Sequence, residues 1–592
     1  MNSLIWRGVS STTIKGLLIC ELPPITKPQM RVSETVIDGR DGSTFEELGY
    51  SSYDKAVQIG LYGEYDIDKV IKYFTGEGDI IFSNEPTKVY SAKICSQIDY
   101  NRLLRYRQAT VVFRVQPFKH KYNEAIRETP SATASGTSIV VSDCEEAHLK
   151  AFKIYGKSTQ NGTPTPDAPV DIVSIGDDGN IGVNVNGINL FNLQSGVIFG
   201  STTPVTFIEN GFILNANNQT NRLTSFKCKL KKGNTYFLSY DFTKVSGIGN
   251  ASAYIPKTQQ YLMVNKSFVA LDDSEEICIY TDSAYVPSVI NVRNIQISMT
   301  SEKKDYELYK NQSIILSNPL RAIPVTDKSL ATYTDADGKM WCADEIDLDR
   351  GVYVQRVKNI TLDGTESWSI GGKTLGDGSD WYYTTTVYND AENTGDGKVV
   401  CTHYPYGIIN NGNAINGVAM VWKSLRIRWG TMGTVADFKS WLLLNPIQVI
   451  YRLETPIETP LTDEQIAICK SLKANNPTTT ILNDENAYMM VEYIKPFEVM
   501  NEGLEPSKPI MTLNGSGTVE ISVNGLGIFS YTFPEGENEV VIDSEKQDAY
   551  LNGVLKNRNM NGEFPILQPK TNRIRWSGDI KNIKVFPRSR WL

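Results

Sequence analysis

Short stretches in which apolar and polar residues alternate recur along the whole chain, and they restrict its fold more than any other feature. Alternation with period two is typical of strands that bury one face. Glycine (45) and proline (26) punctuate these stretches, and long runs of helix-forming residues are missing from the 592 residues. We therefore predict an all-β, multidomain protein. The clearest such stretches are residues 92–98, 110–115, 235–240, 276–280, 289–297 and 350–357.

Changes in composition indicate where domains begin and end. Residues 122–142 shift to Thr, Ser, Ala and Gly, the segment 162–169 is rich in proline, and residues 501–509 read as a linker. The order of elements favours an N-terminal β-sandwich with one helix, inserted jelly-roll-like β-sandwich modules and a small C-terminal sandwich. The predicted parts are residues 1–122, a linker with strap strands at 123–180, a jelly-roll module at 181–312, a second β-rich module at 313–497, and residues 498–592.

Three short helices stand out from the strand pattern. Asp66 is a good N-cap for apolar residues at 67, 70, 71 and 74, and Gly76 follows them. A second helix is expected after Thr434 and should stop before Pro446. A third should follow the capping box that Thr462 opens.

Charge and hydropathy exclude several classes of protein. The formal net charge is −8, so the whole chain is not a general binder of nucleic acid or anionic membranes. No stretch reaches the roughly 18 apolar residues of a membrane span, and no secretory signal pattern is present, so we expect no membrane anchor. The eight cysteines are far apart, which predicts isolated buried thiols in a protein made in a reducing cytoplasm.

Catalytic and cofactor signatures are scarce. Only three histidines occur, and no nucleophile elbow is found. Gly156-Lys157-Ser158 lacks the upstream glycine of a phosphate loop, and Asp335-Ala336-Asp337-Gly338 fits a hairpin turn better than a calcium loop. We therefore expect no catalytic residues, no metal, no cofactor and no enzyme. Carboxylate pairs suited to glycoside hydrolysis stay possible among 67 acidic residues.

One aromatic stretch is a candidate carbohydrate site. Sugar rings pack their C–H faces on aromatic rings while polar side chains bind the hydroxyls. Asp380, Trp381, Tyr382 and Tyr383 follow a Gly-rich stretch, which places them on an expected loop. The segment 422–429 is a second stretch of rings beside polar groups.

The segment 31–50 reads as a long hairpin arm instead of core. Its centre, residues 37–42, holds two turn dipeptides, Asp38-Gly39 and Asp41-Gly42, with Arg40 between them.

Two stretches of the chain are basic, against the acidic average. Residues 93–121 carry seven basic residues and one acidic residue, and residues 556–592 carry nine basic and two acidic residues. Such stretches are usually the outward positions of amphipathic strands, with contact to a protein or nucleic acid as the alternative.

Motifs at both ends resemble one family. At the N-terminal end these are Trp6-Arg7-Gly8, the Gly39-Arg40-Asp41-Gly42 arm, the helix at 66–74 and the exit at 114–119. At the other end they are residues 508–517, 564–569, 572–578 and 587–592. Together they resemble the distal tail protein of long, flexible-tailed phages that infect Gram-positive bacteria. This resemblance implies a galectin-like fold for the C-terminal sandwich.

Residues 123–497 depart from the short members of that family, in which the second domain follows the first almost directly. Members with such an insertion carry carbohydrate-binding modules there. The inserted text itself is similar to modules of phage tail and baseplate proteins. The similar stretches are residues 155–164, 189–192, 294–297, 306–309 and 344–352.

The resemblance implies a hexameric ring at the distal end of the phage tail, and hence a virion protein. The ring would join the tail tube protein to the tail-tip and tail-associated baseplate proteins, with passing DNA only in its central channel. Asp38, Arg40 and Asp41 would then belong to an arm that contacts the next subunit. The insertion would bind host cell-surface polysaccharide. Two alternatives stay open: the insertion only braces neighbouring baseplate proteins, or it degrades glycan.

Overall fold

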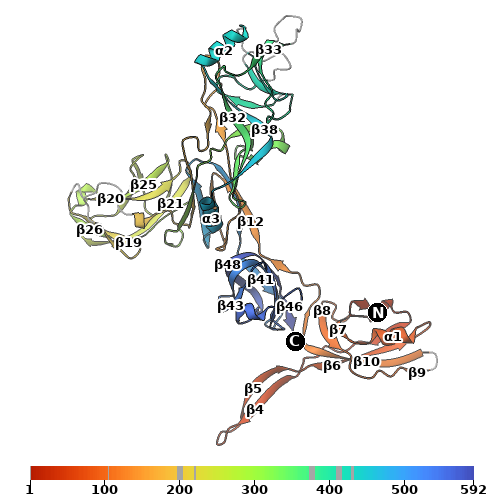
Figure 1. Cartoon of the computed structure of the whole chain (residues 1–592). Coiled ribbons are helices and arrows are strands. Elements are labelled where there is room, and N and C mark those ends of the chain that lie inside the picture. The colour runs from red at the N-terminus through yellow and green to blue at the C-terminus, as the bar shows by residue number, and fades with distance from the viewer. Residues whose placement is uncertain are drawn as a thin grey trace. The chain divides into compact units, whose positions relative to one another are not determined.

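The computed structural model describes residues 2–103, 106–195, 205–218, 222–372, 381–395, 397–407, 417–428 and 433–592. The described residues form 49 strands and three α-helices, so the all-β, multidomain prediction is confirmed (Figure 1). They divide into two compact units. The first holds residues 1–130 and 496–592, and the second holds residues 131–495. The finer division into five parts stays a prediction.

The first unit begins with an antiparallel sheet around a ring-rich core. Trp6 and Phe82 each meet Phe113 edge-on, at centroid distances of 5.2 and 6.1 Å. The helix α1 (Ile67–Tyr73) covers this core, and Asp66 caps it as predicted. The expected strand 92–98 is wrong in its bounds, because pairing ends at Lys93. The strand order is β2 (Val9–Ser10), β1 (Leu4–Trp6), β7 (Glu77–Phe82), β8 (Lys88–Lys93), β10 (Tyr106–Lys121), β6 (Tyr53–Leu61) and β3 (Leu17–Glu21), and β9 (Asn101–Leu103) and β49 (Arg590–Trp591) also pair with β10.

The same unit holds a second β body made of the C-terminal residues. Two long strands, β42 (Ile510–Val523) and β48 (Lys570–Phe586), run side by side through it. The first half of β42 pairs with β44 (Glu539–Asp543) and its second half pairs with β43 (Leu526–Thr532), so one strand serves two layers. The remaining strands are β11 (Arg127–Glu128), β41 (Phe497–Asn501), β45 (Asp548–Leu551), β46 (Val554–Leu555) and β47 (Met560–Gly562).

The interpretation of residues 501–509 as a linker is wrong. The Asn501 side chain is 1% exposed and donates to the carbonyl oxygens of Glu505 (2.9 Å) and Leu567 (3.0 Å). The Ser507 hydroxyl is also buried and donates to the Pro587 carbonyl. Gly and Pro indicate irregular backbone, but buried side chains here satisfy that backbone inside the fold.

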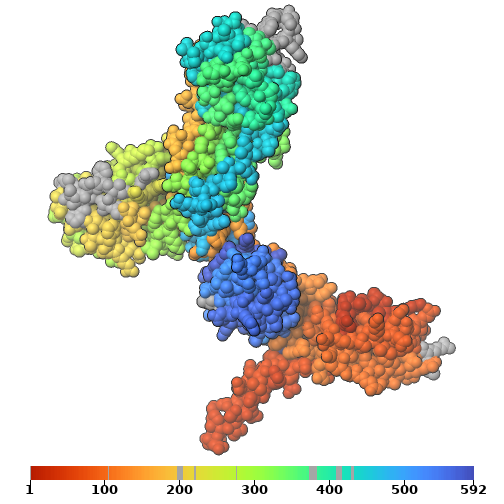
Figure 2. All heavy atoms as spheres, in the orientation of Figure 1, coloured from red at the N-terminus to blue at the C-terminus, as the bar shows by residue number. Residues whose placement is uncertain are grey.

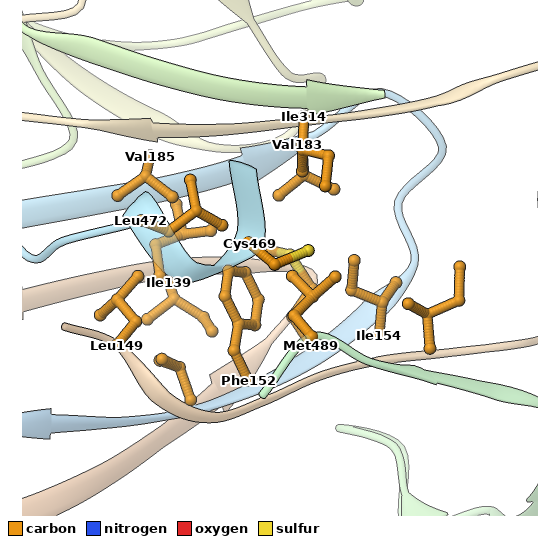
Figure 3. Packing of buried hydrophobic residues seen from close by; sticks show 14 of the residues in the cluster. Ile139, Leu149, Phe152, Ile154, Val183, Val185, Ile314, Cys469, Leu472 and Met489 are labelled. Atoms are coloured by element: carbon orange, nitrogen blue, oxygen red, sulfur yellow. The ribbon is translucent and has the colours of Figure 1, made fainter. Parts of the chain in front are cut away.

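One core of the second unit lies between two sheets. Phe152, Val183 and Met489 pack in this core, and Cys469 and Leu472 at the end of α3 (Asp463–Ser471) close it (Figure 3). One sheet has the order β12 (Ser131–Gly136), β40 (Tyr488–Ile494), β14 (Lys150–Tyr155), β31 (Glu345–Asp347), β32 (Val352–Leu362), β38 (Ile447–Pro460) and β35 (Val399–Cys401). The other has the order β13 (Ser138–Ser142), β39 (Thr478–Asn483), β17 (Ile181–Asn186) and β27 (Asn311–Leu316).

The unit's first and last strands pair with each other. β12 runs antiparallel to β40, and Ser131 lies opposite Ile494. The segment that enters the unit and the segment that leaves it are therefore neighbours in one sheet.

A β-sandwich with its own core extends from this sheet pair. Residues between 188 and 297, among them Phe212, Phe226, Leu238 and Ile290, fill the space between its two sheets. One sheet has the order β18 (Val205–Ile208), β19 (Gly211–Ala216), β26 (Ser288–Ser298), β21 (Thr235–Ser246) and β24 (Lys266–Val269). The other has the order β20 (Leu223–Leu230), β25 (Ser274–Tyr280), β22 (Ser252–Ile255) and β23 (Gln260–Leu262).

A further core lies beside the ends of β32 and β38. The helix α2 (Val435–Leu444) packs Phe438 and Leu442 into it, and it ends at Asn445 before Pro446 as predicted. Both predicted capping residues, Thr434 and Thr462, form complete capping boxes. The sheet that packs against α2 has the order β33 (Trp368–Gly372), β34 (Trp381–Thr385), β37 (Ser424–Arg428) and β36 (Gly417–Val421). A smaller sheet has the order β28 (Ala322–Val325), β30 (Met340–Ala343) and β29 (Tyr333–Thr334).

Candidate assembly and recognition sites

A two-stranded hairpin forms the arm that the sequence predicts. Its strands, β4 (Met30–Val36) and β5 (Ser43–Tyr50), pair only with each other, and neither contains a buried residue. Figures 1 and 2 show it as a narrow projection from the first unit. At its base the Tyr50 ring meets the Phe118 ring of β10 edge-on at 5.8 Å. The arm is thus anchored at one end and exposed along its length.

One face of the arm, called the apolar face below, carries three exposed apolar side chains interleaved with Glu34, Ser43 and Glu47. Val32 lies opposite Glu47, Phe45 opposite Glu34, and Val36 opposite Ser43. Directly paired residues in an antiparallel ladder point to the same face, and alternate residues do too. Val32 (50% exposed), Phe45 (66%) and Val36 (72%) therefore lie on one face of a ribbon that nothing in this chain covers among the described residues.

The predicted contact residues of the arm lie at its tip. Asp38, Arg40 and Asp41 are exposed in the turn between β4 and β5. The backbone N–H of Arg40 donates to the Ile37 carbonyl, and Gly39 and Gly42 both have positive φ, which closes the turn. The structure thus adds the apolar face of the arm, behind the tip, to the charged tip that the sequence singled out.

Four of the seven basic residues in the stretch 93–121 form ion pairs within the first unit. Lys93 pairs with Glu77, Lys121 with Glu502, and Arg114 with Asp54. The hydrogen bonds from Arg114 hold the pKa of Asp54 below its ordinary value. Lys119 forms a nearly buried ion pair with Glu85, at 2.8 Å, and the two side chains are 11% and 10% exposed. These ion pairs favour a structural role for the stretch over contact with a protein or nucleic acid.

The C-terminal basic stretch is also bound up in the fold. Arg588 makes two hydrogen bonds to the buried Asp543 carboxylate, and the Arg590 guanidinium donates to the Pro506 carbonyl. Lys584 pairs with Glu128 at 3.0 Å. Several of these cations therefore hold the C-terminal body together.

The aromatic stretch predicted as a carbohydrate site lies on a strand, not on a loop. Trp381 and Tyr382 are in β34, where their side chains lie outside the described structure, and Asp380 lies outside the described residues. Tyr383 is 1% exposed and stacks on Phe438 at 4.1 Å. Its ring belongs to the core, so the prediction of Tyr383 as a sugar-stacking residue is wrong.

The second aromatic stretch has one exposed ring. Trp422 is 60% exposed at the turn between β36 and β37, with the Arg426 guanidinium 5.4 Å from its ring centre. Leu443 and Leu444, at the end of α2, are 68% and 81% exposed. Each of these three side chains leaves a large apolar area exposed.

The remaining motifs have structural roles. Asp335 accepts backbone N–H groups of Asp337 and Lys339 in the turn between β29 and β30, as the hairpin prediction requires. Burial lowers the pKa of His120 and of His403, which lie in different units. No group of three or more His, Cys, Asp or Glu side chains suited to a metal occurs among the described residues.

The thiols and the helices give two further outcomes. All eight cysteines are free, and six are buried as expected, but Cys20 and Cys95 are exposed. Within the described part of the chain, no helix has the length and apolar character needed to cross a membrane.

Comparisons with known proteins give likenesses to solved structures only. No protein-family model and no curated protein matches the chain. Among solved structures, the chain is similar to the Dit protein (gp 19.1) of phage SPP1, described as a paradigm of the hub adsorption apparatus in phages that infect Gram-positive bacteria. The identity is 13%, the match covers 50% of this chain and 99% of that chain, and the TM-score is 0.18.

Proposed function

We propose that this chain is a structural subunit of the tail tip of a phage that infects Gram-positive bacteria. Copies of the first unit form a ring that joins the tail tube to the tip proteins, and the second unit binds saccharide on the host surface. The observation that carries this proposal is the apolar face of the arm, formed by Val32, Val36 and Phe45. The motifs at both ends of the sequence support it.

The physical argument starts from the instability of such an arm in isolation. A two-stranded hairpin is marginally stable in water, and exposed apolar side chains gathered on one face, as Val32, Val36 and Phe45 are here, mark a site that another surface covers. A contact between an arm and a different patch on the next copy is heterologous, and such contacts close into rings when the rotation permits. The arm therefore supplies the kind of contact that a ring requires.

A second function of the insertion, bracing neighbouring tail proteins, is favoured by one observation. Trp422, Leu443 and Leu444 are large apolar side chains with more than half of their surface exposed. Aromatic and apolar residues of this kind are common at the centres of protein interfaces. Exposed aliphatic side chains such as Leu443 and Leu444 suit a protein partner better than a sugar, and both roles can coexist in one insertion.

The ring is tested on the full-length chain. Mass photometry and negative-stain electron microscopy of the purified protein should show hexameric rings with a central channel. A chain that stays monomeric at every concentration would contradict the ring. Immunogold labelling of virions should mark the distal end of the tail, and label elsewhere would contradict the proposed location.

The saccharide role is tested with the same preparation. Wall polysaccharide purified from Gram-positive cells should bind the full-length chain in a saturable manner. Release of reducing ends during incubation would instead support the glycan-degrading alternative. Absence of binding to any wall fraction would leave the bracing role for the insertion.

A further inference from the structure

The sandwich of β18–β26 contains a hollow of about 490 Å³ at one edge. This size falls within the range of about 300–1,000 Å³ that is typical of small-molecule sites. Its floor includes Phe191 and Ile295, which are 1% and 3% exposed. Phe207, on the edge strand β18, is 52% exposed and lines the hollow beside the core.

Two buried amides fix the walls of this hollow. The Asn189 side chain, 1% exposed, donates to the carbonyls of Ile295 (3.0 Å) and Glu307 (2.9 Å). Its oxygen accepts the N–H groups of Phe191 (2.9 Å) and Ile297 (3.2 Å). One side chain thus ties its own segment to residues 295–297 and to residue 307, more than 100 residues further along the chain.

Gln296 extends the same frame. It is 1% exposed, its oxygen accepts the Glu307 N–H at 2.9 Å, and its nitrogen donates to the Asp305 carbonyl at 3.1 Å. The segment that carries Tyr306 and Leu308 is therefore held against β26 before any ligand arrives. A site whose walls are fixed in advance loses little conformational entropy on binding.

The lining combines aromatic rings with polar groups that have no partner. Tyr306 and Tyr309 line the hollow with Gln194 and Asn210. In the described structure none of these four side chains makes a hydrogen bond within the chain. The described lining includes no charged side chain. Rings with adjacent hydroxyl and amide groups, and without charge, match a sugar ring, which has apolar C–H faces and a rim of hydroxyls.

We propose that this hollow binds an uncharged sugar residue of a host surface glycan. Phe207 and Tyr306 contact the C–H faces of the sugar, and the side chains of Gln194, Asn210 and Tyr309 bind its hydroxyls. The inference deepens the saccharide half of the proposed function and rests on it. It places the site on the sandwich of residues 188–310, away from the stretch 380–383 that the sequence singled out.

The test uses the full-length chain with substitutions at the rim of the hollow. Phe207→Ala and Tyr306→Ala should each weaken binding to neutral wall polysaccharide about tenfold. Tyr306→Phe, which removes only the hydroxyl, should weaken it less. Isothermal titration calorimetry gives the affinities, and thermal unfolding shows that each variant is folded. Free neutral hexoses and N-acetylhexosamines, used as competitors, should displace the polysaccharide.

Tyr261→Ala is the matched control. Tyr261 is 73% exposed on β23 of the same sandwich, where its ring lies 5.8 Å from that of Tyr254 and 6.2 Å from that of Tyr280. Its neighbour Leu262 points into the core, so Tyr261 points to the outer face of the sheet. Binding should be unchanged in this variant.

Each other outcome overturns the inference in a distinguishable way. Binding that survives in Phe207→Ala and Tyr306→Ala but is lost in Tyr261→Ala moves the site to the outer face and leaves the saccharide function intact. Uptake of an apolar dye without any sugar overturns the ligand class. Failure of the wild-type chain to bind any wall polysaccharide overturns both the hollow and the saccharide role. Ring formation, measured separately, still tests the tail-tip role in that case.

Discussion

Replacing Phe45 with threonine should weaken self-association of the chain. Phe45 is 66% exposed on the apolar face of the arm, opposite Glu34. Threonine suits a strand, so the hairpin keeps its backbone preference while the apolar ring is lost. A carboxylate at this position would instead repel Glu34 and disturb the arm itself.

The size of the effect follows from the exposed fraction of the ring. Burying a fully exposed phenylalanine side chain contributes about 1.5–3 kcal/mol. Two thirds of that value, about 1–2 kcal/mol, is available at Phe45 when a neighbouring copy covers it. The dissociation constant of each arm contact should therefore rise about 5- to 30-fold in Phe45→Thr.

Sedimentation velocity over a range of concentrations measures this change, with Leu526→Thr as the control. Leu526 is 73% exposed on β43 of the same unit, so the control loses a comparable apolar side chain outside the arm. The concentration at which the assembly half-dissociates should rise in Phe45→Thr and stay at the wild-type value in Leu526→Thr. Equal behaviour of the two variants would refute the assignment of the arm as the contact site.

Three further predictions concern stability. Burial raises the pKa of Asp344 from 3.8 to about 6. Between these two pH values the folded chain keeps a proton that the unfolded chain releases. As the pH rises from 3.8 to 6, this group should therefore lower the free energy of unfolding by about 3 kcal/mol. Denaturant titrations from pH 3.5 to 7 should show that Asp344→Asn lacks this part of the pH dependence, and identical profiles would contradict it. Glu85→Gln leaves the nearly buried Lys119 ammonium without its charged partner and should destabilise the first unit by about 3–5 kcal/mol. Calorimetry should show this as a lower transition temperature. An unchanged transition temperature would mean that the ion pair does not stabilise the unit. Gly156→Ala would place a methyl carbon 2.4 Å from the Arg321 carbonyl oxygen, so thermal unfolding of the second unit should show a loss of about 1–3 kcal/mol. Wild-type stability would instead mean that the backbone at these two residues can shift without cost.

The local signals in the sequence predicted the parts of the fold that depend on neighbouring residues. Each of the three helices begins directly after its N-cap residue. Asp66, Thr434 and Thr462 therefore marked where the helices begin. The arm was predicted from turn residues at its own tip. The bounds of the strand near residue 93 were missed, since the end of pairing depends on the partner strand, and the sequence does not show the partner.

The candidate sites were harder to predict for the same physical reason. The hollow brings together residues 189–194, 207–210, 295 and 306–309, and no local pattern joins segments so far apart. The stretches around Asn189 and Tyr306 were singled out only by resemblance, and the structure shows that Asn189 bonds directly to the backbone of the second stretch. Tyr383 was misjudged because a ring beside polar residues reads alike in a loop and in a strand that buries alternate side chains.

The pairing of Ser131 with Ile494 has a consequence for how such a chain can change over time. The entropy cost of closing a loop grows only slowly with its length, and here β12 and β40 hold the ends of the whole second unit together. For the folding of the first unit, this long insertion is therefore equivalent to a short loop whose two ends are adjacent. A recombination event that exchanges everything between the two junctions would replace the second unit at little cost to the folding of the first unit.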